Sequence, residues 1–325
     1  MSLPTVTVIS LGGTIAMSGE NGVTPALTGD DLVAAVPGLG DVATLETVNF
    51  RLLPGASLRL DDLDELAAEI ERRLDAGADG VVVTQGTDTI EETAFHLDLH
   101  LDRTEPVVVT GAMRNATLPG ADGPANLYAA VVVAASGPDV GGVVVVLDDH
   151  VHAAGDVTKA HSTLPSAFTS PNTGPIGLVA EGRLILSSVP VRRSPRIHRA
   201  TSGAHPLSVP IVTIGLDDDG ATLAAAVNAD AVVLDACGAG HVPQWLVEPI
   251  AQHAERIPVV MTSRTRTGPV LRQTYGFPGS ERDLRARGVL SCGPLNALKA
   301  RILLLALLRS GMSRAEIVEY LAEID

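Results

Sequence analysis

Short runs of valine and isoleucine, separated by longer amphipathic segments, constrain the fold of this chain more than any other feature. Four such runs occupy residues 6–9, 81–84, 107–110 and 143–147. Apolar runs of this length, bounded by turn residues, are typical of strands buried on both faces of a parallel sheet. Helical three- and four-residue apolar spacing lies between them, at residues 60–74, 91–101 and 125–135. This alternation predicts a doubly wound α/β sheet with right-handed crossovers.

The length of the chain indicates two domains. It has 325 residues, whereas single domains mostly contain roughly 100–200. Residues 176–189, with Gly182 midway, predict a β-hairpin that closes the first domain. We therefore expect a larger, doubly wound N-terminal catalytic domain over residues 1–190, a linker over residues 191–208 and a smaller α/β C-terminal domain over residues 209–325.

The C-terminal part repeats the alternation in a shorter form. Strands and helices are predicted in turn at residues 209–214, 222–228, 231–235, 244–255 and 258–262. Two helices close the chain. Pro294 suits the first turn of one of them, and Ser313 with Glu316 forms a capping box for the other.

The charge of the chain argues against several classes of partner. The formal net charge is −15 and the sequence pI is about 4.9. An acidic surface repels the phosphate backbone, so nucleic acid is not an expected partner. No apolar run reaches the ~18 residues that a bilayer span requires, and the first strand begins without a separate signal segment before it. We therefore expect no membrane partner and a cytoplasmic location.

Cysteine and lysine are both rare. Cys237 and Cys292 are too few for a disulfide framework and lie in no CxxC pair, so buried free thiols are the preferred interpretation. The 23 basic residues include two lysines, Lys159 and Lys299. Because arginine cannot lose its proton, a retained lysine suggests a place where a neutral amine is wanted, although chance retention is an alternative.

Two turns that follow predicted strands carry the first chemical signal. Residues 11–16, LGGTIA, place Thr14 at the carboxyl end of the first strand, where open α/β sheets bind their ligands. This segment matches neither a P-loop nor a dinucleotide fingerprint, and a plain turn is the alternative. Residues 84–89, TQGTDT, repeat the pattern with Thr87 and Asp88, for which a helix N-cap is the alternative. Two parallel strands that end in Gly-Thr predict two hydroxyls in one crevice.

A lysine follows near the same predicted edge. Lys159 ends the segment GDVTK at residues 155–159. Together with Thr87 and Asp88 it would reproduce the logic of a Ser-His-Asp triad with other residue types, the lysine acting as general base. A solvated, ion-pairing lysine is the alternative.

Other polar segments favour structural roles. We expect residues 110–114 to form a pocket wall and the turn at residues 120–126 to be mostly structural. His150, His152 and His161 lie near several aspartates, but their spacing matches no zinc pattern, so we expect no metal site.

In this order, the segments resemble the bacterial-type L-asparaginase/glutaminase family. The similarity extends nearly end to end and is strongest at residues 11–16, 84–93, 110–114, 121–128 and 156–159. It implies a two-domain α/β enzyme, usually a homotetramer built from intimate dimers. It also implies hydrolysis of L-asparagine to L-aspartate and ammonia, without a metal or organic cofactor.

The resemblance implies catalytic roles for four residues. Thr14 resembles the nucleophile that attacks the side-chain amide and forms a covalent β-aspartyl intermediate. Thr87, Asp88 and Lys159 resemble the second catalytic group.

It implies substrate contacts as well. Asp88 occupies the position that binds the substrate's α-ammonium group, and Ser57 is similar to the segment that holds the α-carboxylate. The carbonyl of Ala112 would face the leaving amide nitrogen. Glu281 lies where the family supplies a carboxylate from the neighbouring subunit.

Two departures from the family leave alternatives open. Residues 17–31 contain no tyrosine to assist the nucleophile, and Thr24 is a candidate substitute. His241 and Pro243 occupy a region where the family often has asparagine. The alternatives are a hydrolase of another amide, such as L-glutamine or D-asparagine, and a non-catalytic protein that binds aspartate or asparagine. An amidotransferase subunit acting on charged tRNA is disfavoured by the net charge of −15.

Overall fold

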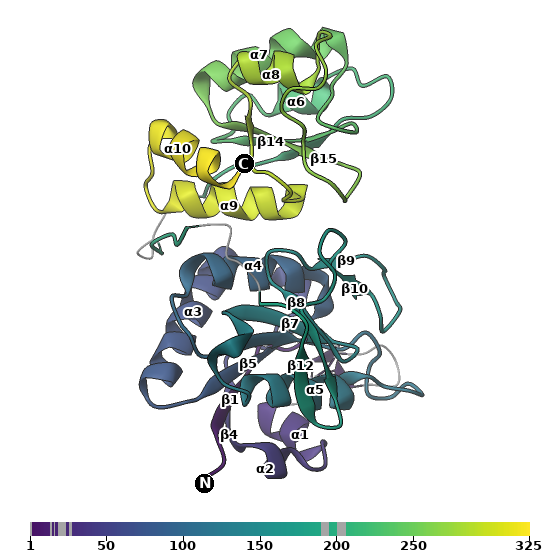
Figure 1. Cartoon of the computed structure of the whole chain (residues 1–325), viewed down its shortest axis with the longest axis vertical. Helices are drawn as coiled ribbons and strands as arrows, with labels where there is room; N and C mark the ends of the chain where they lie inside the picture. The colour runs from purple at the N-terminus through teal and green to yellow at the C-terminus, as the bar shows by residue number, and fades with distance from the viewer. Residues whose placement is uncertain are drawn as a thin grey trace. The chain divides into compact units, whose positions relative to one another are not determined.

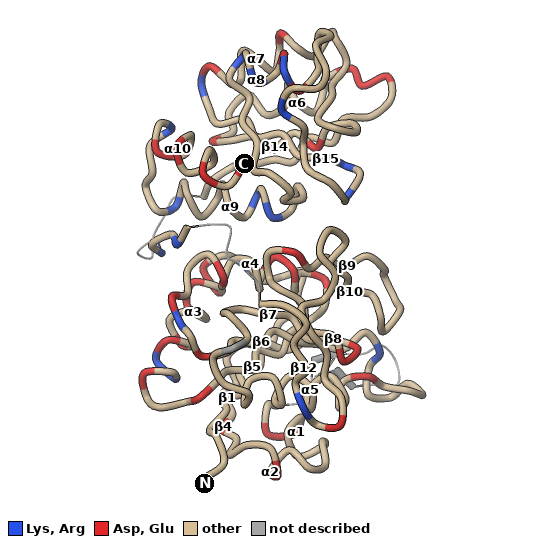
Figure 2. The backbone as a smooth tube through the Cα atoms, in the orientation of Figure 1, with Lys and Arg blue, Asp and Glu red and all other residues tan. Residues whose placement is uncertain are grey.

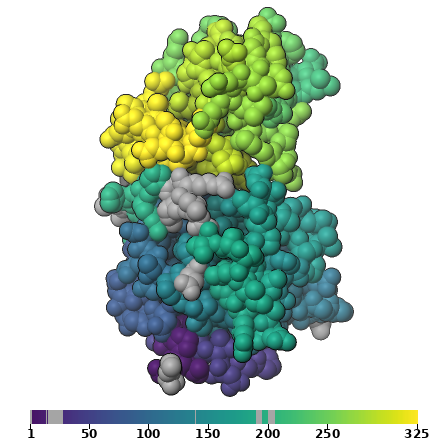
Figure 3. Space-filling model, in the orientation of Figure 1, coloured from purple at the N-terminus to yellow at the C-terminus, as the bar shows by residue number. Residues whose placement is uncertain are grey.

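The computed structural model describes residues 2–13, 15, 17–18, 24–25, 28–189, 195–199 and 206–325. The chain divides into two compact units, Met1–Arg192 and Arg193–Asp325. The first is coloured purple to teal and the second green to yellow in Figures 1 and 3. Each unit mixes strands and helices, so the predicted α/β class, with a larger N-terminal and a smaller C-terminal part, is confirmed.

The first unit is built on an eight-stranded sheet with the order β12-β11-β8-β7-β6-β5-β1-β4. Neighbouring strands from β7 to β4 in this order are parallel, and those from β7 to β12 are antiparallel. The strands are β1 (Thr5–Ser10), β4 (Thr44–Asn49), β5 (Gly80–Thr84), β6 (Val107–Thr110), β7 (Val143–Leu147), β8 (His150–Ala153), β11 (Gly177–Ala180) and β12 (Arg183–Leu186).

The register of the parallel strands decides where their turns emerge. Ser10 of β1 pairs with Thr84 of β5, and Thr84 pairs with Thr110 of β6. The three strands therefore end at the same level. The turns that follow them leave the sheet at one carboxyl edge, which is where open α/β sheets bind ligands.

Helices cover both faces of this sheet because successive valines point to opposite sides. Val81 and Val83 pack with α3 (Leu60–Asp75) and α4 (Ile90–His100). Val82, between them, faces the other layer. That layer consists of α1 (Gly29–Ala34), α2 (Leu39–Val42) and α5 (Gly123–Ala134). Burial on both faces explains why the central strands read as continuous apolar runs.

Short elements complete the first unit. They are the two-stranded pairs β2 (Met17–Ser18) with β3 (Thr24–Pro25) and β9 (Thr158–Lys159) with β10 (Phe168–Thr169), and the 3-10 turns η2 (Gly55–Ser57), η3 (Thr87–Thr89) and η4 (Pro138–Val140).

The second unit has a four-stranded parallel sheet with the order β13-β14-β15-β16. Residues of α6 and α7 share one apolar cluster with this sheet, and α9 packs against β13, β14 and β15. The elements are β13 (Ile211–Thr213), α6 (Ala221–Ala225), β14 (Val232–Ala236), η5 (Gln244–Leu246), α7 (Val247–Arg256), β15 (Val259–Ser263), α8 (Glu281–Ala286), β16 (Leu290–Ser291), α9 (Ala297–Arg309) and α10 (Arg314–Ile324).

The closing helices confirm one predicted cap and correct the other. Ser313 and Glu316 form the expected capping box at the start of α10. Pro294 does not lie in the first turn of α9, because Asn296 caps that helix and accepts a hydrogen bond from the N–H of Lys299. An asparagine side chain offers a better cap than a proline, which supplies no acceptor of its own beyond the backbone.

Acidic segments occur in both units, as the red stretches of Figure 2 show. Within the described residues, no helix combines the length and the apolar character that a bilayer crossing would need.

Candidate active site

The turns at the carboxyl edge of the parallel strands touch one another through glycine backbone. A Cβ atom added to Gly13 would lie 2.0 Å from the nitrogen of Gly86. One added to Gly86 would lie 2.8 Å from the nitrogen of Gly55, and one added to Gly111 would lie 2.6 Å from the carbonyl oxygen of Gln85. No side chain fits at these contacts. The turns after β1, β5 and β6 therefore converge on one place.

Three polar side chains meet beside this contact. The Lys159 amine donates hydrogen bonds to Thr87 Oγ1 at 3.0 Å and to Asp88 Oδ1 at 2.8 Å. Thr87 is 6% exposed, whereas the Asp88 side chain is 70% exposed. A buried hydroxyl in contact with an amine can pass its proton to that amine when the amine is neutral. The exposed carboxylate remains accessible to a cationic group.

A buried carboxylate holds the lysine in place. Lys159 lies in β9, and its backbone N–H donates to Glu91 Oε2 at 2.7 Å. Glu91 is 3% exposed and belongs to α4, which begins directly after the Thr87–Thr89 turn. Glu91 was not predicted as a site residue, since an acid in the first turn of a helix is ordinary. The only feature of the sequence that pointed to Glu91 is that it lies within residues 84–93, one of the segments that resemble the family.

The turn that contains Ser57 packs against the Thr87–Thr89 turn. Gln85 Nε2 donates to Thr89 Oγ1 at 3.3 Å, and Thr89 Oγ1 donates to the carbonyl of Gly55 at 3.0 Å. Ser57 itself is exposed. The structure thus places the Ser57 turn next to Thr87 and Asp88.

The loop around Ala112 is fixed by the turn that follows it. The N–H groups of the two residues after Ala112 donate to the Asp122 carboxylate at 3.0 and 2.8 Å. Asn126 Nδ2 donates to the carbonyl of Gly111 at 2.9 Å. Ala112 is 1% exposed. The turn at residues 120–126 therefore supports the loop at residues 110–114.

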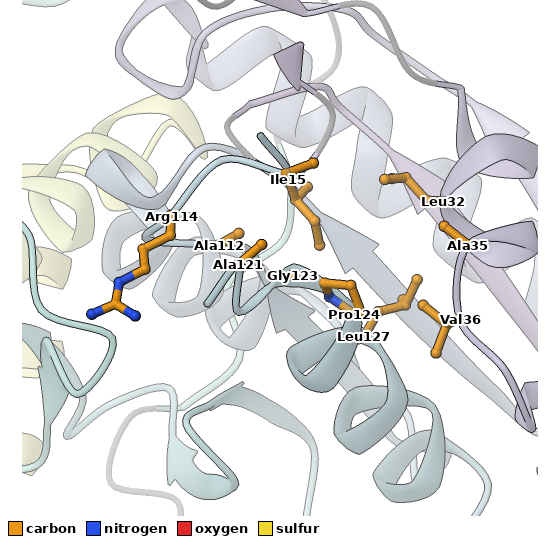
Figure 4. A pocket seen from close by; sticks show the side chains of 11 residues that line it. Ile15, Leu32, Ala35, Val36, Ala112, Arg114, Ala121, Gly123, Pro124 and Leu127 are labelled. Atoms are coloured by element: carbon orange, nitrogen blue, oxygen red, sulfur yellow. The ribbon is translucent and has the colours of Figure 1, made fainter. Parts of the chain in front are cut away.

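A small apolar cavity lies beside Ala112. Its volume is about 50 Å³, and its lining is aliphatic apart from Arg114. Figure 4 shows Ile15, Leu32 and Leu127 around it, with the Arg114 guanidinium pointing away from these side chains. An apolar cavity of this kind cannot by itself hold a zwitterion.

Thr14 lies outside the described residues, and so does the side chain of Thr24. The neighbours of Thr14 are described: Gly13 touches Gly86, and Ile15 lines the cavity beside Ala112.

Glu281 lies in the second unit, at the start of α8, and is fully buried there. Its Oε1 accepts hydrogen bonds from the N–H groups of Thr274 and Tyr275, both at 2.7 Å. Its Oε2 lies 3.3 Å from His241 Nε2, without the alignment of a hydrogen bond. Burial raises the pKa of Glu281, but these partners outweigh burial and hold the pKa below its usual value. The Tyr275 and Phe277 rings are each T-shaped to the His241 ring, with centroids 4.8 and 5.0 Å away.

The three histidines considered for a metal each have another contact. His150 Nδ1 lies 2.7 Å from the carbonyl of Asp148, and His152 Nδ1 lies 2.9 Å from Ser170 Oγ. His161 Nδ1 accepts two backbone N–H groups. Within the described part of the chain these histidines form no group of convergent ligand atoms.

The doubly wound sheet, with polar groups gathered at its carboxyl edge, and the second α/β unit are the features of a two-domain α/β enzyme. Residues 5–192 match the family model "Asparaginase, N-terminal", and residues 208–321 match "Glutaminase/Asparaginase C-terminal domain". The chain therefore belongs to the bacterial-type asparaginase family and is an asparaginase-type amidohydrolase.

Individual relatives agree along nearly the whole chain. A probable L-asparaginase of Deinococcus radiodurans is 38% identical, and the match covers 97% of this chain and 96% of the relative. L-asparaginase 2 of Escherichia coli is 33% identical over 94% of this chain and 88% of its own. The crystal structure of a probable cytoplasmic L-asparaginase from Campylobacter jejuni superposes with a TM-score of 0.87 at 28% identity, covering 98% and 99% of the two chains.

Proposed function

We propose that this chain hydrolyses L-asparagine to L-aspartate and ammonia through a threonine nucleophile, Thr14. The observation that supports this most strongly is the Lys159 amine, which lies 3.0 Å from Thr87 Oγ1 and 2.8 Å from Asp88 Oδ1. This group lies at the turn that touches Gly13, the residue before Thr14.

The reaction would have two steps. Thr14 Oγ forms a bond to the side-chain amide carbon, and backbone N–H groups near Gly13 and Thr87 stabilise the developing oxyanion. The proton that the Thr14 hydroxyl loses passes to the amide nitrogen, the carbon–nitrogen bond breaks and ammonia leaves. A β-aspartyl ester remains on Thr14. Water loses a proton with help from Thr87 and Lys159, attacks the ester and releases aspartate and the Thr14 hydroxyl.

Substrate contacts would position the amide. The exposed carboxylate of Asp88 suits the α-ammonium group, the Ser57 turn suits the α-carboxylate, and the carbonyl of Ala112 would face the leaving nitrogen. Holding both ends of a small substrate positions the amide for attack, and such positioning lowers the activation free energy by several kcal/mol. No metal or organic cofactor takes part in these steps.

Replacement of Thr14 tests the nucleophile. Thr14→Ala should lower kcat for ammonia release from L-asparagine by roughly 10⁴–10⁶-fold, the loss typical of removing one member of a hydrolytic triad, because the residual rate then rests on binding and the oxyanion hole alone. Thr104, an exposed threonine of the same unit, supplies the matched control, Thr104→Ala. Wild-type ammonia release by Thr14→Ala would disprove the assignment.

Which amide is preferred is a separate question. It arises because His241 occupies a region where the family often has asparagine, and His241 lies 3.3 Å from Glu281. We propose L-asparagine; L-glutamine and D-asparagine are the competing amides, and a Pseudomonas aeruginosa relative, 30% identical, is named a glutaminase-asparaginase. Initial rates over the three amides decide between them. Tight calorimetric binding of asparagine with no ammonia released would instead favour a non-catalytic binding protein.

We also propose a homotetramer in which Glu281 serves the site of a neighbouring subunit, with no nucleic-acid or membrane partner. Its lowered pKa would keep Glu281 ionised and attractive to an ammonium group. Sedimentation equilibrium tests the assembly. A cytoplasmic location is supported by the Campylobacter jejuni protein, whereas a Haemophilus influenzae relative is named periplasmic. Cell fractionation distinguishes the two compartments.

A further inference from the structure

Two histidines and an aspartate converge between α3 and α4, and none of them belongs to the candidate active site. They are Asp64, His96 and His100, and each offers one ligand atom within 4.8 Å of the other two. No other group of this kind occurs among the described residues.

Helix geometry brings the three together. His96 and His100 are four residues apart on α4, which places them on one face in adjacent turns. Their ring centroids are 4.5 Å apart. Asp64 reaches them from α3, which packs against α4, and its Oδ1 lies 3.0 Å from His96 Nε2.

His96 is a buried imidazole beside Asp64. This ring is 1% exposed, and its Nδ1 makes no hydrogen bond within the described part of the chain. Polar atoms in such surroundings are nearly always paired. Asp64, whose side chain is 15% exposed, faces the other ring nitrogen. A carboxylate and an imidazole therefore already lie in contact at a site largely shielded from water.

We propose that Asp64, His96 and His100 bind a divalent transition-metal ion such as Zn²⁺ or Co²⁺. Imidazole and carboxylate ligands suit these ions. With bonds of about 2.0–2.2 Å, the ligand atoms of a tetrahedral site are roughly 3.3–3.6 Å apart. Small side-chain rotations close the present separation, and water takes the fourth position. The ion links α3 to α4, the helix that follows Thr87 and Asp88, and stabilises the first unit. The proposed hydrolysis does not use it.

Metal titration of the full chain, without a histidine tag and after treatment with a chelator, tests this proposal. Calorimetry should show one Zn²⁺ bound per chain, and Co²⁺ should give the visible absorption of a nitrogen- and oxygen-ligated ion. The thermal midpoint should rise with added Zn²⁺, because the ion binds the folded state. Absence of stoichiometric binding would overturn the proposal.

Variants identify the ligands. His100→Ala and Asp64→Asn should each weaken Zn²⁺ binding by at least about tenfold, the smallest loss typical even of residues that only support a ligand. His150→Ala, at an exposed histidine, is the matched control and should bind like the wild type. Equal affinity in His100→Ala and the wild type would contradict the assignment.

If the variants fail to fold, a measurement on the wild-type protein still tests the proposal. X-ray absorption of the Zn²⁺-loaded protein should show imidazole and oxygen ligands. A sulfur ligand would assign the ion to a cysteine and overturn the proposal. Ammonia release by metal-free His100→Ala should match the wild type, so failure of the metal site and failure of the proposed hydrolysis are separate results.

Discussion

Thr87 and Lys159 are 72 positions apart in the chain, yet the lysine amine donates to the threonine hydroxyl at 3.0 Å. The sequence predicted their pairing from a lysine expected near the edge where Thr87 emerges and from the family resemblance. In the structure Lys159 reaches Thr87 from β9, which lies outside the eight-stranded sheet. Glu91 was not predicted. Its role depends on burial and on a hydrogen bond to the backbone of Lys159, and neither leaves a pattern in the residue order. Thr14 remains a prediction.

Two substitutions of Lys159 distinguish the contribution of its positive charge from its contribution as a proton acceptor. Lys159→Met should lower kcat for ammonia release by about 10²–10⁴-fold, the usual contribution of a general base. Lys159→Arg should lose nearly as much, because arginine keeps the charge beside Asp88 but cannot lose its proton. Arg183→Met, at an exposed cation of the hairpin, is the control. Near wild-type turnover by Lys159→Arg would show that charge alone suffices.

The contact between glycines can be tested by adding one methyl group. Gly86→Ala places its Cβ 2.8 Å from the nitrogen of Gly55, so backbone must move. We expect a loss of about 1–3 kcal/mol in the free energy of unfolding, as in overpacked cores, together with reduced kcat. Gly40→Ala, whose Cβ meets nothing within 4 Å, should lower neither quantity. Comparable urea midpoints for Gly86→Ala and Gly40→Ala would contradict the prediction that the glycine contact excludes a side chain.

The two thiols should react differently. Burial raises the pKa of Cys292 to about 12, while Cys237 is partly exposed. A thiol reagent at pH 8 should therefore modify one thiol per native chain, at Cys237, and both after unfolding, because the thiolate is the reactive form. Mass spectrometry of the labelled peptides checks this. Fast labelling of Cys292 in the native protein would be inconsistent with the structure.

Long, strongly periodic elements were the predictable ones. The apolar spacing of residues 60–74 became α3, Leu60–Asp75. The edge strand β4, Thr44–Asn49, was not predicted, since it alternates polar residues and has no fully buried position. The two-residue strand β9 was not predicted as a strand either, because its hydrogen bonds come from a distant partner, β10.

The cap of α10 supplies a test at the scale of one element. Ser313→Ala removes the hydroxyl that accepts the N–H of Glu316 and should lower the free energy of unfolding by about 1 kcal/mol. Equilibrium denaturation in urea measures the change. Ser188→Ala, at an exposed serine outside any helix, is the control, and an unchanged midpoint for Ser313→Ala would contradict the importance of the cap.

At the scale of the whole molecule, length and the repeated strand–helix pattern indicated two α/β parts, and the structure divides into two compact units. No comparable sequence pattern indicates how subunits assemble. A role for Glu281 at another subunit's site is thus a matter of family resemblance, and the single chain shows its carboxylate buried beside His241.

Acid should destabilise the second unit. Burial raises the pKa values of Glu281, Asp283 and Asp325, but hydrogen bonds from backbone N–H groups and arginines more than compensate, so all three pKa values are lowered. Such groups stabilise the fold above the pKa of the unfolded carboxyl, about 4, and this stability is lost as pH falls through their folded values. Trp245, the single tryptophan, reports on this unit by fluorescence.

Glutamine substitution identifies the group responsible for that acid sensitivity. Glu281→Gln cannot titrate, so its thermal midpoint should fall less steeply between about pH 5 and pH 3 than that of the wild type. Glu319→Gln, at an exposed carboxylate of α10, should follow the wild-type curve. Identical slopes for Glu281→Gln and the wild type would rule out Glu281 as the source.

The scarcity of lysine has a practical consequence for chemical conjugation. Acylating reagents that attach polymers to side-chain amines find two targets, one hydrogen-bonded to Thr87 and the other, Lys299, 2% exposed. Coupling at the first would block the candidate site, and the second is out of reach in the native fold. The 38 carboxylates are the better handles for immobilising or masking this protein.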